Sequence, residues 1–371
     1  MRIAPAASSR GIALIIVLII IVVLGILAGG FAYSMKVETT LARHASFSSE
    51  LDWLGRAGVE VAKWVLSQSA LGPSGQVDSL KQKWAGGPGE SNDILGAVDL
   101  KNYHIGNGVV SIEIVDLDRK FNINIAAKDP SILQQALTLV GVDAGSFTTI
   151  VSSIQDWCDI DEDPHMSGTE TRDYEQEIPP YTCKDGPIDD MSELLLIRGI
   201  KEEPGIYWGA GGGAVYARPS RSRFGGGFEQ RTYAVGLKDL FTPLSSGKLN
   251  INTASATVLQ IIPFIDENIA QSIIQRRAGP DGQEGTEDDM PFRSPAEITM
   301  GGFGGGAAGP GAPGGPGNPA AMGQFAQLFT VRSLVFEVRV TATIGSSKRE
   351  YVAILRRDNP KSIQTLNLYW K

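Results

Sequence analysis

Residues 156–183 carry the residue types best suited to binding a cation. Their sequence is DWCDIDEDPHMSGTETRDYEQEIPPYTC, and nine carboxylates lie within residues 156–177. Calcium takes about six to eight oxygen ligands from flexible loops, and clustered carboxylates relieve their mutual repulsion by sharing such an ion. We therefore expect calcium binding here, and the ligands expected from this spacing are Asp159, Asp161, Asp163, Glu170 and Asp173.

The same carboxylates are compatible with other kinds of site. An EF-hand is excluded because the sixth loop position needs glycine and is Asp161 or Pro164 here. Zinc is disfavoured because the three histidines are scattered and only His165 lies near a cysteine. A hydrolase with paired carboxylates has no support from a nucleophile elbow, a phosphate loop or an HExxH motif. A solvated acidic loop is the remaining alternative.

A second acidic stretch, GPDGQEGTEDDM, occupies residues 279–290. Its carboxylates alternate with glycines, which is another arrangement that calcium loops use. Its spacing is less specific than that of the first segment. The ligands expected from it are Asp281, Glu287, Asp288 and Asp289.

The N-terminal residues predict a membrane-spanning helix. Arg2 and Arg10 precede an uncharged apolar run over residues 12–33, and about 20 apolar residues span a bilayer core of about 30 Å. The positive flank keeps the first residues in the cytoplasm and exports the rest. A cleaved secretory signal is disfavoured, because the apolar run is too long for the h-region of a signal peptide. Apolar residues continue at helical spacing, which predicts one helix over residues 12–69.

The stretch SSRGIALIIVLIIIVVLGILAGG resembles the leader and first helix of type IV prepilin-like proteins. In that family a prepilin peptidase cuts after the leader glycine and methylates the new N-terminus. The resemblance implies cleavage after Gly11 and methylation of Ile12. The fifth mature position, usually glutamate, is Ile16 here. A carboxylate in a membrane is costly unless paired, and its absence is typical of minor pseudopilin K of type II secretion.

The acidic segment is similar to the pseudopilin K family as well. That family has Asp-Trp-x-Asp-x-Asp followed by Gly-x-Glu and a tyrosine, and calcium binding is described for it. The downstream stretch PIDDMSELLLIRGI also matches. The resemblance adds Asp156 to the expected calcium ligands, and the matching residues are Asp156, Trp157, Asp159, Asp161, Gly168, Glu170 and Tyr174.

Export would place the chain's only two cysteines in an oxidising compartment. We predict a disulfide between Cys158 and Cys183, which would stabilise the fold by about 3 kcal/mol through loop closure. Two free thiols are the alternative.

Period-two alternation predicts strands over residues 107–118, 333–344, 349–357 and 362–370, with mostly helical sequence between the first and the rest. The expected fold class is α+β: a type IV pilin-like fold, with a long N-terminal helix and an antiparallel sheet, carrying a large, mostly helical inserted domain. The predicted divisions are a leader (1–11), a transmembrane part (12–34), a first pilin-like part (35–125), the inserted domain with the acidic loop (126–300), a flexible Gly/Pro-rich loop (301–323) and C-terminal strands (324–371).

An Asn-Ile-Asn core occurs twice, in RKFNINIAAKDPSILQQAL and in GKLNINTASATVLQII. In the second copy we expect Asn252 or Thr253 to cap the next helix. This copy also resembles helix-hairpin-helix DNA-binding modules, but Asp266 and Glu267 stand where phosphate would need donors. A net charge of −8 likewise disfavours nucleic acid as a partner. The pseudopilin K family shares the Asn-x-Asn-Thr-Ala element, so a packing role is expected.

The resemblance to pseudopilin K covers most of the chain and implies a non-enzymatic role. It implies a minor pseudopilin anchored in the inner membrane, with its C-terminal domain in the periplasm. The implied partners are minor pseudopilins I and J, the major pseudopilin and the prepilin peptidase. The implied task is to cap the pseudopilus tip and help start its assembly, for export of folded proteins across the outer membrane. The alternative is an exported DNA-uptake or adhesion protein on a pilin scaffold, with a helix-hairpin-helix-like module.

Overall fold

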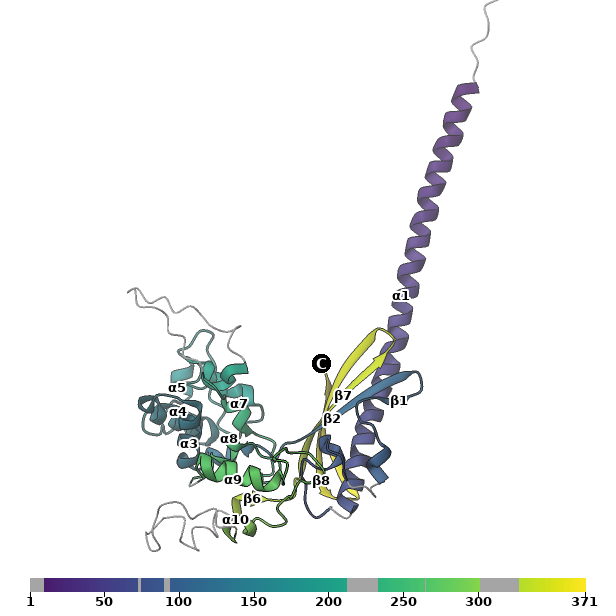
Figure 1. The fold of residues 1–371 in the computed structure, drawn as a ribbon. Coiled ribbons are helices and arrows are strands. Elements are labelled where there is room, and N and C mark those ends of the chain that lie inside the picture. Colours follow the sequence, from purple (N-terminus) through teal and green to yellow (C-terminus); the bar gives the residue numbers. More distant parts are fainter. Residues whose placement is uncertain (1–9, 73–74, 90–93, 212–232, 264, 301–326) are drawn as a thin grey trace, which may run out of the picture.

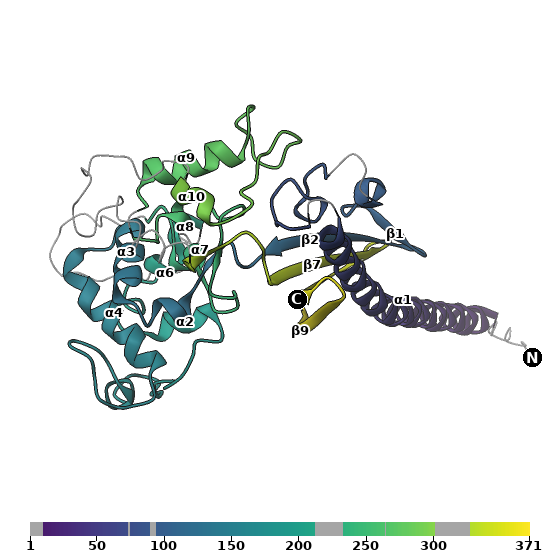
Figure 2. The same ribbon diagram turned by 90° about the horizontal axis from the view of Figure 1, so that it is seen from below.

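The computed structural model describes residues 10–72, 75–89, 94–211, 233–263, 265–300 and 327–371 (Figure 1). A long N-terminal helix lies against an antiparallel sheet, and a helical region lies beside that sheet (Figures 1 and 2). The predicted leader and the Gly/Pro-rich loop lie largely outside the described residues.

Helix α1 runs from Arg10 to Leu71 as one element of 62 residues. Among the described residues it is the one helix long and apolar enough to cross a membrane. Its apolar side chains are exposed in the first half, whereas Leu51, Leu54 and Leu66 are buried against the sheet. At Gly58 an added Cβ would lie 2.4 Å from Val340 and 2.9 Å from Val110, so the close approach of helix and sheet requires glycine there.

The sheet has five strands in the order β1-β2-β7-β8-β9, with every neighbouring pair antiparallel. Strand β2 pairs directly with β7, although the whole helical region lies between them in sequence. Val110 and Ile112 on β2 oppose Ala342 and Val340 on β7, and this apolar face packs on α1. The predicted α+β pilin-like fold is confirmed, and the strands are β1 (Tyr103–Ile105), β2 (Gly108–Asp116), β7 (Val335–Ile344), β8 (Ser347–Asn359) and β9 (Ser362–Trp370).

The helical region follows β2 and has a hydrophobic core separate from that of the sheet. Phe121 and Phe329, outside the predicted range 126–300, belong to this core. Within the stretch PIDDMSELLLIRGI the chain forms a 3₁₀ helix, η3 (Met191–Leu196). The other helices are α2 (Ile123–Ala126), α3 (Pro130–Val140), α4 (Ala144–Cys158), α5 (Thr171–Tyr174), α6 (Gly205–Trp208), α7 (Leu237–Leu240), α8 (Ala256–Leu259), α9 (Glu267–Arg277) and α10 (Ala296–Met300).

Four short strands form two parallel ladders in this region. β3 (Phe121–Asn122) pairs with β4 (Phe241–Thr242), and β5 (Leu249–Asn250) pairs with β6 (Phe329–Thr330). Near the sheet, the short 3₁₀ helices η1 (Lys83–Ala85) and η2 (Ile94–Ala97) pack on α1. The ladders join segments of the helical region that are far apart in sequence.

The two Asn-Ile-Asn copies have the same local structure. Asn124 bonds the backbone N–H and C=O of Ile188, and Asn252 bonds those of Phe292 in the same way. Each asparagine thus fixes a distant segment, which explains the repeat as a packing device. The predicted cap, Asn252 or Thr253, was wrong, because Ser255 caps α8. The side chain of Asn252 is held by Phe292, and the hydroxyl of Thr253 donates to Asp116.

Candidate metal centre

Helix α4 supplies the first carboxylates of the acidic segment. It ends at Cys158, and Asp159 is its C-cap. Asp156 lies on the buried face of α4 and has no exposed surface. A buried carboxylate needs hydrogen-bond donors, and the loop that returns after α4 supplies them. The backbone N–H groups of His165 and Thr169 donate to Oδ1 and Oδ2 of Asp156, at 3.0 and 2.6 Å.

Gly168 has a steric role in closing this loop. A Cβ at this position would lie 1.8 Å from Oδ2 of Asp156. No side chain fits at that distance, so only glycine lets the loop approach the carboxylate closely enough for hydrogen bonding.

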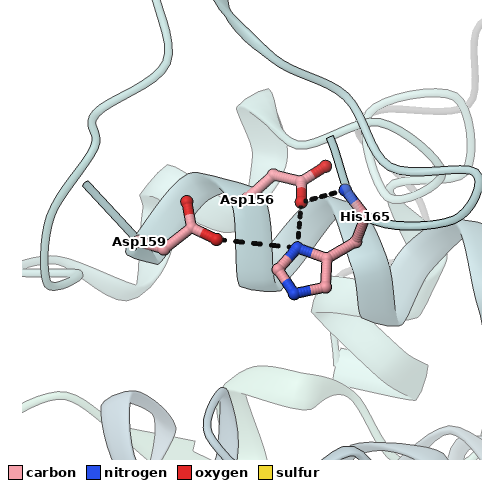
Figure 3. A group of neighbouring side chains, drawn as sticks. All are labelled: Asp156, Asp159 and His165. Atoms are coloured by element: carbon pink, nitrogen blue, oxygen red, sulfur yellow. Dashed lines mark hydrogen bonds and ion pairs between the residues drawn. The ribbon is translucent and has the colours of Figure 1, made fainter. Parts of the chain in front are cut away.

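A first group of candidate ligands lies at the end of α4 (Figure 3). Nδ1 of His165 is 2.6 Å from Oδ1 of Asp156 and 3.5 Å from Oδ2 of Asp159. One ligand atom from each of the three residues lies within 4.8 Å of the other two. The imidazole is partly exposed, whereas Asp156 is enclosed.

A second group consists of Glu170, Cys183 and Asp185, whose ligand atoms also lie within 4.8 Å of one another. Glu170 is only 5 % exposed. Both of its carboxylate oxygens are buried without a hydrogen-bond partner, as are Oδ1 of Asp159 and Oδ1 of Asp185. Buried polar atoms are nearly always paired, so these oxygens indicate a missing partner.

The charges in the two groups act on one another. Burial, followed by the negative charges of Asp156 and Asp159, raises the pKa of Glu170 to about 7. Burial and the charge of Asp161 raise the pKa of Asp159. A divalent cation would pair with the orphan oxygens and offset this repulsion. The donors are mainly carboxylate oxygens, which fit a hard cation such as calcium.

Aromatic side chains and a cluster of ion pairs pack beside the site. Trp157 meets Tyr174 edge-on, with ring centroids 5.6 Å apart, and Tyr174 stacks on Tyr181 at 5.0 Å. Nε1 of Trp157 donates to Glu193 at 3.3 Å, and Lys184 donates to the same carboxylate at 2.8 Å. These contacts hold residues 187–200 against the acidic loop.

The structure brings together some of the predicted ligands. Asp156, Asp159 and Glu170 belong to the two groups, and Asp161 is near enough for its charge to act on Asp159. Asp163 and Asp173 are exposed, and neither is in a group of potential metal ligands among the described residues.

Sequence reasoning missed Asp185. It lies 15 positions after Glu170 in the chain and has a positive φ of 52°, a conformation that aspartate tolerates better than most residues. The pair Asp185-Gly186 is a turn signal, but nothing in the sequence places this turn beside Glu170. In the sequence, His165 stands out only as a zinc ligand candidate near a cysteine.

The predicted disulfide is absent, and both cysteines are free. The Cys183 thiol donates to the backbone carbonyl of Asp156 at 3.4 Å, whereas the Cys158 thiol faces the backbone of Ile188. Each sulfur therefore has its own backbone partner. Burial raises the pKa of both thiols to about 12, so both are protonated at neutral pH.

The second acidic loop has a different arrangement. Asp289 accepts from the N–H of Gly285 at 2.7 Å, and Asp288 accepts from the N–H of Asp281 at 2.9 Å. Glu284 pairs with the buried Arg277. No described carboxylate oxygen of this loop is both buried and unpartnered. Calcium ligation by Asp281, Glu287, Asp288 and Asp289 stays a prediction.

The long helix packed on an antiparallel sheet, with a helical region inserted between β2 and β7, defines a pilin-like protein with an inserted domain. The solved GspK-GspI-GspJ complex from the type 2 secretion system of enterotoxigenic Escherichia coli contains a similar chain. The TM-score is 0.60 at 16 % identity, covering 89 % of this chain and 99 % of the other. At that identity the likeness establishes the fold.

Residues 119–204, which contain the acidic segment, match the family model for type II secretion system (T2SS) protein K. Type II secretion system protein K of Klebsiella pneumoniae is 25 % identical over 207 residues, covering 52 % of this chain and 58 % of the relative. A putative protein K of Escherichia coli K12 is 27 % identical over 205 residues with the same coverages. For protein K of Pseudomonas aeruginosa the identity is 23 %, with 76 % and 75 % covered.

The match to the protein K family model over residues 119–204 and the similarity to these relatives agree with the resemblance seen in the sequence motifs. The aligned part spans 58 % of the length of the first two relatives.

Proposed function

We propose that the chain is a minor pseudopilin of the type II secretion system that caps the pseudopilus tip and helps start its assembly. The observation that carries this proposal is the position of the helical region. It lies at the end of the molecule opposite the apolar half of α1 (Figure 1). A subunit anchored by α1 would present this bulky region away from the membrane, where it would block addition of a further subunit.

The proposed partners are minor pseudopilins I and J, since the similar solved chain is part of a complex with GspI and GspJ. Co-purification of the full chain in detergent with I and J tests this. A stable ternary complex is expected, and no complex at micromolar concentrations would contradict the proposal. Retention on double-stranded DNA at physiological salt would favour the DNA-uptake alternative. Asp266 opposes that alternative, because its carboxylate caps α9 at the connection where phosphate would bind.

We also propose that α1 anchors the chain in the inner membrane with residues after it in the periplasm. Its mature N-terminus would be a methylated Ile12 after cleavage behind Gly11. Ile16 fits a subunit that has no neighbour above it to pair with. Mass spectrometry of the N-terminal peptide from membranes tests the cleavage, and an intact leader in the assembled complex would contradict it.

For the metal centre we propose calcium, held by Asp156, Asp159, Glu170 and Asp185, with a structural role and no catalysis. Four buried, unpartnered carboxylate oxygens support this proposal. Native mass spectrometry of the full chain should show a bound calcium that is lost in Glu170→Gln. Glu287→Gln, at an exposed position in the second acidic loop, is the matched control and should keep this calcium.

A further inference from the structure

A cluster of buried charged side chains lies where the helical region meets the sheet. Asp78 follows α1, Asp116 and Asp118 stand at the end of β2, and Arg357 is on β8. Each of the four is at most 3 % exposed. Asn250 and Ser333 complete the cluster, so segments from both parts of the molecule meet there.

The charges in this cluster do not balance. Arg357 pairs with Asp78 and also donates to the backbone carbonyl of Ser333 at 2.9 Å. Within the part of the chain that the structure describes, neither Asp116 nor Asp118 forms an ion pair. An uncompensated buried carboxylate is costly, and such a group usually holds a proton instead.

Both carboxylates accept backbone N–H groups, and Oδ1 of Asp116 accepts that of Asp118 at 2.8 Å. The two carboxylates differ in the contacts of Oδ2 of Asp116. Asp118 accepts from the backbone N–H of Ser246 and that of Leu334, both at 2.6 Å. Backbone N–H groups can only donate, so they favour the ionised form of Asp118 and partly offset burial, which raises the pKa of Asp118. Oδ2 of Asp116 instead contacts the hydroxyls of Thr253 at 2.5 Å and Ser333 at 2.6 Å. A hydroxyl can accept as well as donate, so Asp116 can carry a proton without losing these contacts.

We propose that the junction binds one proton on Asp116, and that this proton helps hold the helical region on the sheet. Proton-bearing Oδ2 donates to one hydroxyl and still accepts from the other, joining β2 to Thr253 in the helical region. Asn250 bridges the same atoms, with Nδ2 2.7 Å from Oγ of Ser333 and 3.2 Å from Oδ2 of Asp116. This proposal is independent of the proposed function.

The surrounding charges support this assignment. Burial, followed by the charge of Asp118 and, more weakly, that of Asp78, raises the pKa of Asp116 to about 7. Arg357 forms an ion pair with Asp78. Arg277 forms an ion pair with Glu284 and donates to the backbone carbonyls of Ile251 and Ala254. Two further cations, Lys248 and Arg332, line an adjacent cavity of about 350 Å³ with Ser333 and Arg357. Among the described residues, neither of them forms an ion pair with Asp116 or Asp118, so they do not compensate the two carboxylates directly.

The sign of the pH effect follows from these observations. Because the pKa of Asp116 is higher in the folded state than in the unfolded chain, its contribution is fully present below about pH 4 and is lost as pH rises through about 7. Attachment of the helical region should therefore weaken from mildly acidic to mildly alkaline pH.

The test is thermal melting of the full chain in detergent with saturating calcium, from about pH 5 to about pH 8. Asp116→Asn removes the titrating carboxylate at the junction. Asn250 can give up its hydrogen bond to residue 116, because the Ser333 hydroxyl and the backbone carbonyl of Asp78 accept its two N–H groups. The fall in Tm with pH should be at least halved in Asp116→Asn. It should persist in Asp358→Asn, an exposed carboxylate on the same strand as Arg357. An unchanged slope in Asp116→Asn would overturn the proposal.

A second measurement uses the unmodified chain and therefore does not depend on the folding of a variant. Infrared spectra of the full chain with isotope-labelled aspartate carboxyls should show a protonated aspartate at about pH 6 that disappears by about pH 8. Over the same range, backbone hydrogen exchange in residues 246–254, corrected for intrinsic rates, should accelerate. Absence of the protonated aspartate signal, or unchanged exchange, would overturn the proposal.

Discussion

The two acidic loops of the helical region differ in how their carboxylates are satisfied, although their sequences are similarly rich in Asp and Gly. In the loop after α4, Glu170 and Asp185 have buried oxygens with no partner. In the loop after α9, Asp288 and Asp289 accept backbone N–H groups of their own loop. The second loop can hold its shape through its own hydrogen bonds. The first has a deficit that a cation would fill. Acidic composition alone therefore does not indicate a metal site, whereas unpaired buried oxygens support one.

The largest expected effect comes from filling the space beside Asp156. Gly168→Ala places a methyl group 1.8 Å from Oδ2 of Asp156, so the loop must move away and lose the two backbone hydrogen bonds to that carboxylate. We expect destabilisation of about 3 kcal/mol or more and loss of calcium binding, measured by denaturant unfolding and calorimetric titration.

Gly186→Ala is the matched control, because the nearest atom to its added Cβ is 3.8 Å away. It should change the free energy of unfolding by less than about 1 kcal/mol. Equal effects of the two substitutions would show that the close approach at Gly168 is unimportant.

A second prediction is that Glu170→Gln has opposite effects on thermal stability without and with calcium. In calcium-free protein, Glu170→Gln removes a buried charge, so the variant should melt at a higher temperature than the parent chain near pH 8. With calcium, the parent should gain stability that the variant does not. If calcium stabilises both equally, Glu170 is not a ligand.

The pH dependence of the calcium-free chain follows from the same residue. The pKa of Glu170 is raised to about 7, above its usual value of about 4.3. Its contribution to stability is therefore fully present below about pH 4 and is lost as pH rises through about 7. In Glu170→Gln this part of the decline in Tm should be missing, which melting at several pH values in EDTA would reveal.

The smallest expected effect is in the second loop. Asp289→Asn replaces an acceptor of the Gly285 and Thr286 N–H groups, and should cost about 1 kcal/mol. The loss should be the same with calcium and with EDTA, as measured by urea unfolding. A loss seen only with calcium would mean that this loop also binds the ion.

Local sequence patterns predicted the architecture for two reasons. The period of the apolar residues shows which face of a strand or helix is buried, and the length of an apolar run shows whether it can span a membrane. The alternation in residues 333–344 appears as β7, and the apolar run from residue 12 lies within α1. The metal centre was predicted only in part. Asp156 and Glu170 could be found from the acidic segment. Asp185 could not, because its position depends on the turn after Cys183 packing back on α4, which is a tertiary contact.

The cysteines and the helix cap were mispredicted for a related reason. Spacing alone allowed a disulfide, but the Cys183 thiol is directed to the Asp156 carbonyl. Asn252 is a good capping residue, but its side chain holds the backbone of Phe292 instead. In both cases a long-range backbone partner outweighed the local preference.

We propose that calcium bound to the acidic segment after α4 stabilises the helical region. The most direct test is the melting temperature of the full chain in detergent, first with calcium, then with EDTA, then with calcium restored. Calcium at about a thousand times its Kd should stabilise the folded state by about 4 kcal/mol. EDTA should lower the Tm, and added calcium should restore it. A Tm that is the same in calcium and in EDTA would contradict this proposal.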